Sequence, residues 1–121
     1  MRRPILRLLP ALAFLPLAGF LHNHLVKSSP EAGARLEQAP AELKLWFAEK
    51  PEVAFTSVTL MKADSSRIAT IRAVAADDTM AVTIPLAGTA LAPGRYLVGW
   101  RTASRDGHAV RGTFGFSIIS P

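Results

Sequence analysis

The chain has 121 residues, a length typical of one domain, and half of them are hydrophobic. It contains no cysteine, which excludes disulfides, thiolate metal sites and a cysteine nucleophile. The formal net charge is +5, but no basic run stands beside aromatic residues, which argues against nucleic-acid binding.

Residues 1–21 have the composition of a secretory signal peptide. Three arginines precede an apolar run over residues 8–21. The run is short, and Pro10 and Pro16 interrupt it, so an uncleaved membrane anchor is the less favoured alternative. We expect export to remove residues 1–21. The mature chain, residues 22–121, would be a soluble domain with eleven basic and nine acidic residues, a net charge of +2.

Seven short strands are predicted, because hydrophobic residues alternate with polar ones and turn residues separate the segments. The segments are His24–Val26, Leu43–Phe47, Phe55–Leu60, Ile68–Val74, Thr79–Leu86, Tyr96–Trp100 and Gly112–Ile119. Strands at a spacing of about ten residues, with no amphipathic helix, are typical of an antiparallel sandwich or Greek-key barrel. The predicted fold class is therefore all-β, an immunoglobulin-like β-sandwich.

Aromatic residues at alternating strand positions are predicted to fill the core rather than to form a ligand-binding patch. They are Trp46, Phe47, Phe55, Tyr96, Trp100, Phe114 and Phe116. Met61 and Met80 are predicted to fill the core as well. The sequence Pro93-Gly94-Arg95-Tyr96 has the pattern of a tyrosine corner, in which the phenol bonds to upstream backbone.

The chain has only three histidines: His22, His24 and His108. Asp106-Gly107-His108 lies between two predicted strands. Because Asp-Gly favours a tight turn, this motif alone is most simply a hairpin loop with an exposed histidine.

His22 would become the first mature residue if cleavage follows Leu21. Its α-amine and imidazole could then chelate one ion. Asp106 and His108 would add a carboxylate and a second imidazole. This nitrogen-rich set suits tetragonal Cu(II), whereas Zn(II) could use the same groups but prefers a tetrahedron. Cleavage after Gly19 instead would place two residues before His22 and displace the amine.

Three parts of the mature chain resemble the CopC family of copper resistance proteins. They are His-x-His-Leu-Val-x-Ser-Ser-Pro-x-x-Gly from His22, Leu-x-Phe-x-Glu ending at Glu49, and Pro-Gly-x-Tyr-x-Val-x-Trp-Arg-x-x-Ser-x-Asp-Gly-His-x-Val-x-Gly-x-Phe-x-Phe from Pro93. The resemblance implies a periplasmic β-sandwich that binds Cu(II) and handles copper, often with the membrane protein CopD.

By motif position, the family's copper ligands fall on His22, Asp106 and His108. His24 is a weaker candidate, and Glu49 matches an acidic position near the family's site. Some members carry a methionine-rich Cu(I) site, but this sequence has three methionines and no cluster of them.

The leading hypothesis is a periplasmic Cu(II) carrier or buffer that is not an enzyme. One alternative is a copper oxygenase of the histidine-brace type, but Asp106 would fill a position that oxygen chemistry needs open. The other alternative is a metal-free immunoglobulin-like interaction module. The sequence leaves the oligomeric state open.

Overall fold

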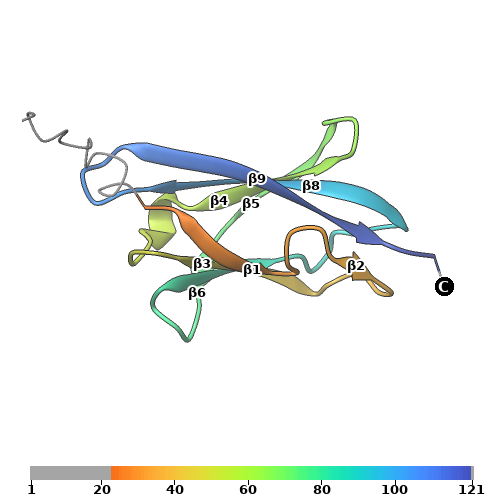
Figure 1. The fold of residues 1–121 in the computed structure, drawn as a ribbon, viewed down its shortest axis with the longest axis horizontal. Helices are drawn as coiled ribbons and strands as arrows, with labels where there is room; N and C mark the ends of the chain where they lie inside the picture. Colours follow the sequence, from red (N-terminus) through yellow and green to blue (C-terminus); the bar gives the residue numbers. More distant parts are fainter. Residues whose placement is uncertain (1–22, 121) are drawn as a thin grey trace, which may run out of the picture.

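The computed structural model describes residues 23–120, and two β-sheets pack face to face in it (Figure 1). The predicted signal peptide and His22 lie outside these residues. The four-stranded sheet has the order β1 (Leu25–Ser29), β3 (Glu42–Phe47), β7 (Ala81–Pro85), β6 (Val74–Ala75). The five-stranded sheet has the order β2 (Arg35–Leu36), β9 (Ala109–Ile118), β8 (Gly94–Ala103), β4 (Ser57–Lys62), β5 (Arg67–Arg72).

The predicted all-β sandwich is confirmed. Each of the seven predicted segments overlaps one of the seven longer strands, although the bounds differ by up to a few residues at each end. The two additional strands, β2 and β6, have two residues each. The predicted strand over Ile68–Val74 is divided, because β5 ends at Arg72 and β6 belongs to the other sheet. All strand pairs are antiparallel except β2 with β9, which is parallel. No helix within residues 23–120 is long and apolar enough to cross a membrane.

The core lies between the inner faces of the two sheets. Alternate residues of β3, β4, β7, β8 and β9 point inward, as strand geometry requires. The buried hydrophobic strand residues are Leu43, Leu45, Phe47, Val58, Leu60, Ala81, Val82, Ile84, Tyr96, Val98, Trp100, Phe114, Phe116 and Ile118. Phe47 and Trp100 meet edge to face across the sandwich, with ring centroids 5.5 Å apart. The period-two prediction therefore identified most of the core.

The prediction was wrong for Phe55, whose side chain is 67% exposed. Val53–Phe55 forms a short 3₁₀ helix, η1, so β4 begins only at Ser57 and Phe55 falls outside its alternation. Trp46 is only half-buried, because it faces outward from β3. The ammonium groups of Lys27 and Lys44 lie 4.6 and 4.9 Å from its ring centroid.

The tyrosine corner is confirmed. The Tyr96 hydroxyl donates a hydrogen bond of 2.5 Å to the carbonyl of Ala92, four residues upstream. The bond fixes the turn that leads into β8.

Gly112 of β9 lies directly opposite Trp100 of β8. A Cβ atom at residue 112 would be 2.4 Å from the Trp100 ring, which is closer than atoms can approach. Only glycine leaves room for the indole to lie against this strand. A Cβ atom at residue 99 would meet a side chain that can move, because the nearest atom is the end of the Met61 side chain, Cε, at 3.2 Å.

Gly112→Ala is expected to lower the free energy of unfolding by about 1–3 kcal/mol, the usual cost of overpacking a core. Gly99→Ala is the matched control. It adds the same methyl group to the partner strand, β8, at a position where the end of the Met61 side chain can move aside. Urea denaturation of both variants tests this. An equal or smaller loss for Gly112→Ala would contradict the packing argument.

Candidate metal centre

Strands β8 and β9 form a hairpin of ten consecutive residue pairs, from Gly94 with Ile118 to Ala103 with Ala109. Residues 104–108 connect them. The Ser104 amide donates to the carbonyl of His108, and the Gly107 amide donates to the carbonyl of Ser104, both at 2.9 Å. Gly107 has φ of +88°, which glycine adopts without strain. The predicted hairpin loop is therefore confirmed.

Asp106 and His108 contact each other at the tip of this loop. His108 Nδ1 lies 2.8 Å from Asp106 Oδ2, and the two side chains are 72% and 46% exposed, respectively. The other carboxylate oxygen, Oδ1, accepts hydrogen bonds from the Ser104 hydroxyl at 2.5 Å and from the His108 amide at 3.1 Å. The loop therefore fixes the position of the carboxylate and presents the imidazole to solvent.

The Asp106 carboxyl is ionised at ordinary pH. Three hydrogen bonds hold the pKa of this carboxyl well below its usual range. The largest effect comes from the Ser104 hydroxyl, and smaller effects come from the backbone amide and the ring of His108. Ser104 itself is buried, with 3% exposure. A serine hydroxyl has one proton to donate, and the 2.5 Å contact to Asp106 is much shorter than its 3.3 Å contact to the His108 carbonyl.

At the other end of the chain, the Asn23 side chain holds the segment that leads into β1. Asn23 is 2% exposed. Its amide nitrogen donates to the carbonyl of Glu49 at 2.9 Å, and its oxygen accepts the amide protons of Glu49 at 2.8 Å and His24 at 3.0 Å. Asn23 and Glu49, which are far apart in sequence, are thus joined by two hydrogen bonds that hold the chain in place at Asn23.

The start of β1 and the β8–β9 loop lie at the same end of the sandwich (Figure 1). Glu49, Lys50 and Glu52 line one surface hollow together with Arg105 of the loop. Since Asn23 is bonded to Glu49, the point at which the chain enters the described fold is close to the hairpin loop.

The structure thus brings Asp106 and His108 together, whereas His22 lies outside the described residues. Within residues 23–120, no three or more histidine, aspartate, glutamate or cysteine side chains form a group that could hold a metal ion. His24 and Glu49 therefore do not complete the pair into such a group. Sequence reasoning missed the roles of Ser104 and Asn23. The spacing of Ser104 and Asp106 can be seen in the sequence, whereas the burial of Ser104 and Asn23 cannot.

The spacing of the Asp106–His108 pair suits two adjacent ligands of one ion. Two donor atoms at about 2.0 Å from an ion, with 90° between the bonds, lie about 2.8 Å from each other. His108 Nδ1 and Asp106 Oδ2 have this separation. A divalent ion could therefore replace the proton that the two atoms share. Alternatively, Asp106 could orient the ring while the other nitrogen binds the ion.

Comparison with known proteins gives the family. Residues 25–119 match the model of the CopC domain. The chain belongs to the CopC family. It is 34% identical over 112 residues to the copper transport protein CutJ of Bacillus subtilis, and 32% identical over 108 residues to copper resistance protein C of Xanthomonas campestris pv. juglandis. The matches cover 92% and 84% of this chain. They cover only 20% of CutJ but 83% of the Xanthomonas protein.

Solved structures agree with this assignment. CopC from Methylosinus trichosporium OB3b superimposes with a TM-score of 0.73 and 29% identity, covering 82% of this chain and 95% of that one. PcoC, a methionine-rich copper resistance protein from Escherichia coli, superimposes with a TM-score of 0.67 and 28% identity. The match covers 80% of this chain and 98% of PcoC. The sandwich is thus the fold of a family of copper transport and resistance proteins.

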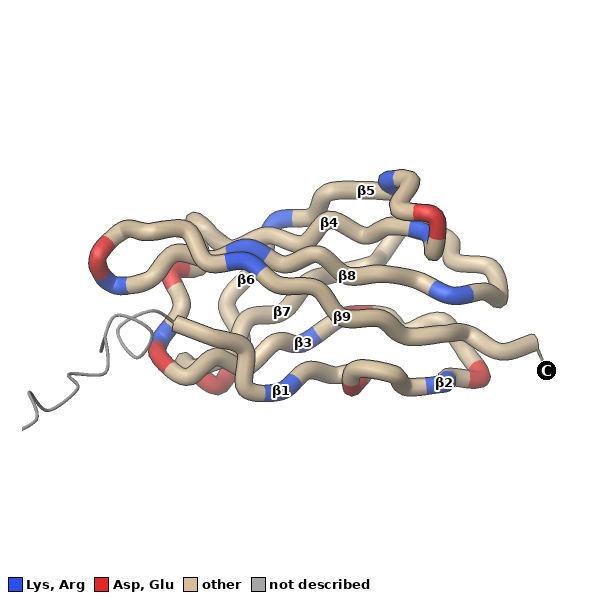
Figure 2. The backbone as a smooth tube through the Cα atoms, turned by 45° about the horizontal axis from the view of Figure 1, so that its top comes forward, with Lys and Arg blue, Asp and Glu red and all other residues tan. Residues whose placement is uncertain are grey.

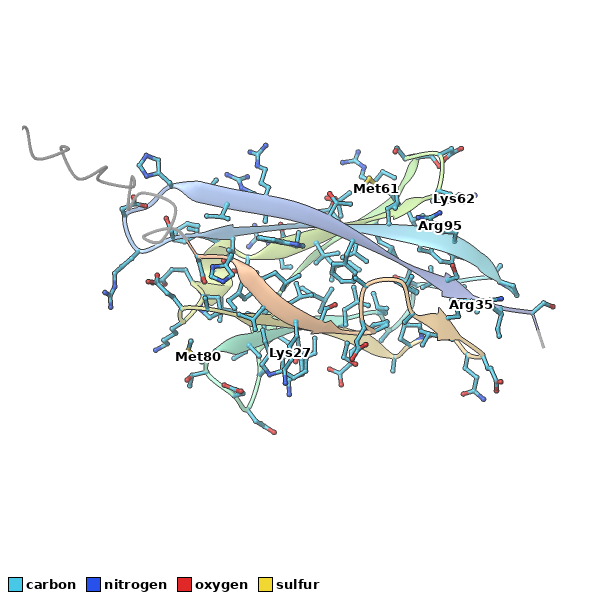
Figure 3. All side chains as sticks on the ribbon, viewed as in Figure 1. Lys27, Arg35, Met61, Lys62, Met80 and Arg95 are labelled. Atoms are coloured by element: carbon cyan, nitrogen blue, oxygen red, sulfur yellow. The ribbon has the colours of Figure 1, made fainter. Side chains whose placement is uncertain are left out.

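Two methionines of this chain cannot share a copper ion. Met61 belongs to β4 of the five-stranded sheet, and Met80 precedes β7 of the four-stranded sheet; Figure 3 shows them on opposite layers. Among the described residues, the two thioethers therefore do not form a joint Cu(I) site. The Asp106–His108 pair offers oxygen and nitrogen donors, which suit a divalent ion better.

Ser104→Ala is expected to raise the pKa of Asp106, because it removes the largest of the interactions that lower it. It should also weaken copper binding about tenfold, the lower end of the effect of losing a group that supports a ligand. The carboxyl ¹³C shift measured against pH, together with copper competition titration, tests this. Ser104→Thr keeps the hydroxyl and is the control. An unchanged Asp106 titration in Ser104→Ala would contradict the assigned hydrogen bond.

Asn23→Ala is expected to release the segment before β1 and to weaken copper binding about tenfold, as when a supporting hydrogen-bond partner is lost. Asn23→Asp is the graded control, since a carboxylate can still accept both amide protons but cannot donate to the Glu49 carbonyl. Hydrogen exchange at the Glu49 amide provides a readout that needs no copper. If exchange there is as slow in Asn23→Ala as in the wild type, the contact does not hold this segment.

Proposed function

We propose that this protein binds one Cu(II) ion through the α-amine and imidazole of His22, the carboxylate of Asp106 and the imidazole of His108. It acts as a periplasmic carrier or buffer in copper homeostasis. The observation that carries the proposal is the Asp106–His108 pair, with its 2.8 Å spacing and an ionised carboxylate. The β8–β9 loop that carries the pair lies at the end of the sandwich where the chain enters β1 (Figure 1).

The donor set supports Cu(II) over other ions. Two imidazoles, an amine and one carboxylate suit a tetragonal divalent ion, and Cu(II) stands highest in the affinity order. A proton must leave each nitrogen before it binds metal, so the affinity is expected to fall as the pH is lowered. His24 and Glu49 are kept as weaker candidates for a place near the ion.

The relatives support a role in copper handling rather than catalysis, since those quoted are named for copper transport or copper resistance. We further propose that residues 1–21 direct export and that a CopD-like inner-membrane protein exchanges copper with this chain. In CutJ, the matching region is only a fifth of a longer protein. That arrangement is compatible with a domain that works beside other parts of a transport system.

A histidine-brace oxygenase is the alternative function. It would need an open coordination position, which Asp106 fills in the site proposed here. Turnover of oxygen or peroxide by the copper-loaded protein, at a rate above that of free copper, would favour the oxygenase over the carrier.

His108→Ala and Asp106→Asn are both expected to lower the Cu(II) affinity more than 100-fold, because each removes a direct bond to the ion. Loss of a merely supporting group typically changes metal affinity 10–100-fold. Competition titration against a chelator of known affinity measures both. Equal affinity in wild type and His108→Ala would refute the proposed site. A loss of only 10–100-fold in Asp106→Asn would show that the carboxylate orients the ring and does not bind the ion directly.

The amino terminus is tested by comparing a protein that begins at His22 with one that carries an additional Gly before it. The first has a free amine and an imidazole on one residue, whereas the second has an amide at that nitrogen. We expect clearly tighter Cu(II) binding by the first and a different visible spectrum. Mass spectrometry of the exported protein identifies which form exists. Indistinguishable binding would remove the amine from the ligand set and leave His22, His24 and His108 to be tested as a three-imidazole site.

A further inference from the structure

The two sheets differ sharply in charge. The strands of the five-stranded sheet contain seven basic residues and no acidic residue. Those of the four-stranded sheet contain two basic residues and one acidic residue. In Figure 2 the acidic residues lie mainly in the connections between strands, and blue segments cross the β5, β8 and β9 region.

Three arginines form one row across the outer face of the five-stranded sheet. Ser57 of β4 pairs with Arg72 of β5 on one side and with Arg101 of β8 on the other, and Arg101 pairs with Arg111 of β9. Directly paired residues point to the same face of a sheet. The neighbouring positions, such as Trp100 and Val58, are buried, so the row faces outward, and all three arginines are exposed.

This row is electrostatically unfavourable for the isolated domain. Arg101 and Arg111 are like charges directly opposite each other, an arrangement that destabilises a sheet. None of the three arginines forms an ion pair with another residue of the described chain. The fold therefore carries concentrated positive charge that no described acidic residue neutralises.

A hollow of about 400 Å³ borders the row at the end nearest the hairpin loop. Phe55, Arg72, Arg101 and Gly107 are among the residues that line it. Phe55 is therefore an exposed aromatic ring within the same basic surface.

The position of η1 beside β8 is fixed by a chain of buried hydroxyl groups. Thr56 donates to the carbonyl of Glu52 at 2.7 Å, and its oxygen lies 2.8 Å from the Thr102 hydroxyl. A carbonyl only accepts, so Thr102 donates to Thr56. The hollow between η1 and the hairpin is thus part of the folded structure rather than of a loose loop.

We propose that the row of Arg72, Arg101 and Arg111, with Phe55 beside it, is a docking surface for an acidic segment of a partner protein. The guanidinium group binds carboxylates through two parallel hydrogen bonds, which gives direction as well as charge attraction. Adjacent strands lie about 4.8 Å apart, so the row extends over three strand spacings, about 14 Å. An extended acidic peptide, with like-facing carboxylates about 7 Å apart, can place several along it.

A protein partner is favoured over a membrane surface. Lipid headgroup binding through charge alone typically uses four to eight clustered lysines or arginines, whereas this row has three. The surface also lies next to the hairpin: Arg101 is three residues before Ser104, where the loop with Asp106 and His108 begins. A partner docked here would be adjacent to that loop. The docking surface itself does not depend on copper being bound.

The experiment uses the metal-free protein and a synthetic peptide of four Glu-Ala repeats, blocked at both ends, at low ionic strength. The arginine variant is Arg72→Gln, Arg101→Gln and Arg111→Gln together. The control is Lys62→Gln, Arg67→Gln and Arg95→Gln, which removes the same charge from the same sheet. Figure 3 shows Lys62 and Arg95 at the end far from the hairpin loop. Melting temperatures establish that both variants fold.

NMR titration is expected to give saturable amide shifts around the arginine row in the wild type and in the control. The arginine variant should bind at least tenfold more weakly, and wild-type binding should weaken as salt is added. Equal affinities of the two variants would overturn the proposal, because only total charge would then matter. Absence of saturable peptide binding would overturn it too, as would binding of phosphatidylglycerol vesicles but not of the peptide.

Discussion

The β8–β9 hairpin is the element on which the rest of the structure depends. Its ten consecutive pairs fix which residues face the core and which face solvent. One face of the two strands supplies Tyr96, Trp100 and Phe116 to the sandwich core. The other face supplies Arg101 and Arg111 to the surface. A shift of one residue in this pairing would exchange the two faces, because side chains alternate along a strand.

The same pairing determines the chemistry of the loop. Because the last pair is Ala103 with Ala109, five residues must reverse the chain, and Gly107 provides the left-handed conformation in that turn. The buried Ser104 hydroxyl then meets the Asp106 carboxylate, and the carboxylate meets the His108 ring. A rigid support is what a metal ligand needs, since a loosely held donor loses entropy when it binds.

The second support of the proposed centre is the contact between Asn23 and the Glu49 backbone. It compensates for a general difficulty of terminal ligands, which is that chain ends are poorly ordered unless they are tied down. Asn23 can perform this role because an amide side chain both donates and accepts, and so it satisfies the N–H and the C=O of one residue at once. Asn23 precedes β1 and the loop joins β8 to β9, and the packing of the sandwich brings these two supports to the same end.

The sequence by itself determined the period-two pattern, the hairpin and the tyrosine corner, because these depend on local alternation and on residues with restricted backbone conformations. Motif positions also indicated Asp106 and His108, which are only two residues apart. Tertiary structure alone decided that Phe55 is exposed, that the segment after β5 changes sheets at Ala73, and that Asn23 contacts Glu49. It alone aligned Arg72, Arg101 and Arg111, which come from three strands. The physical reason is that these features depend on strand order and on contacts across long sequence separations, which no local pattern specifies.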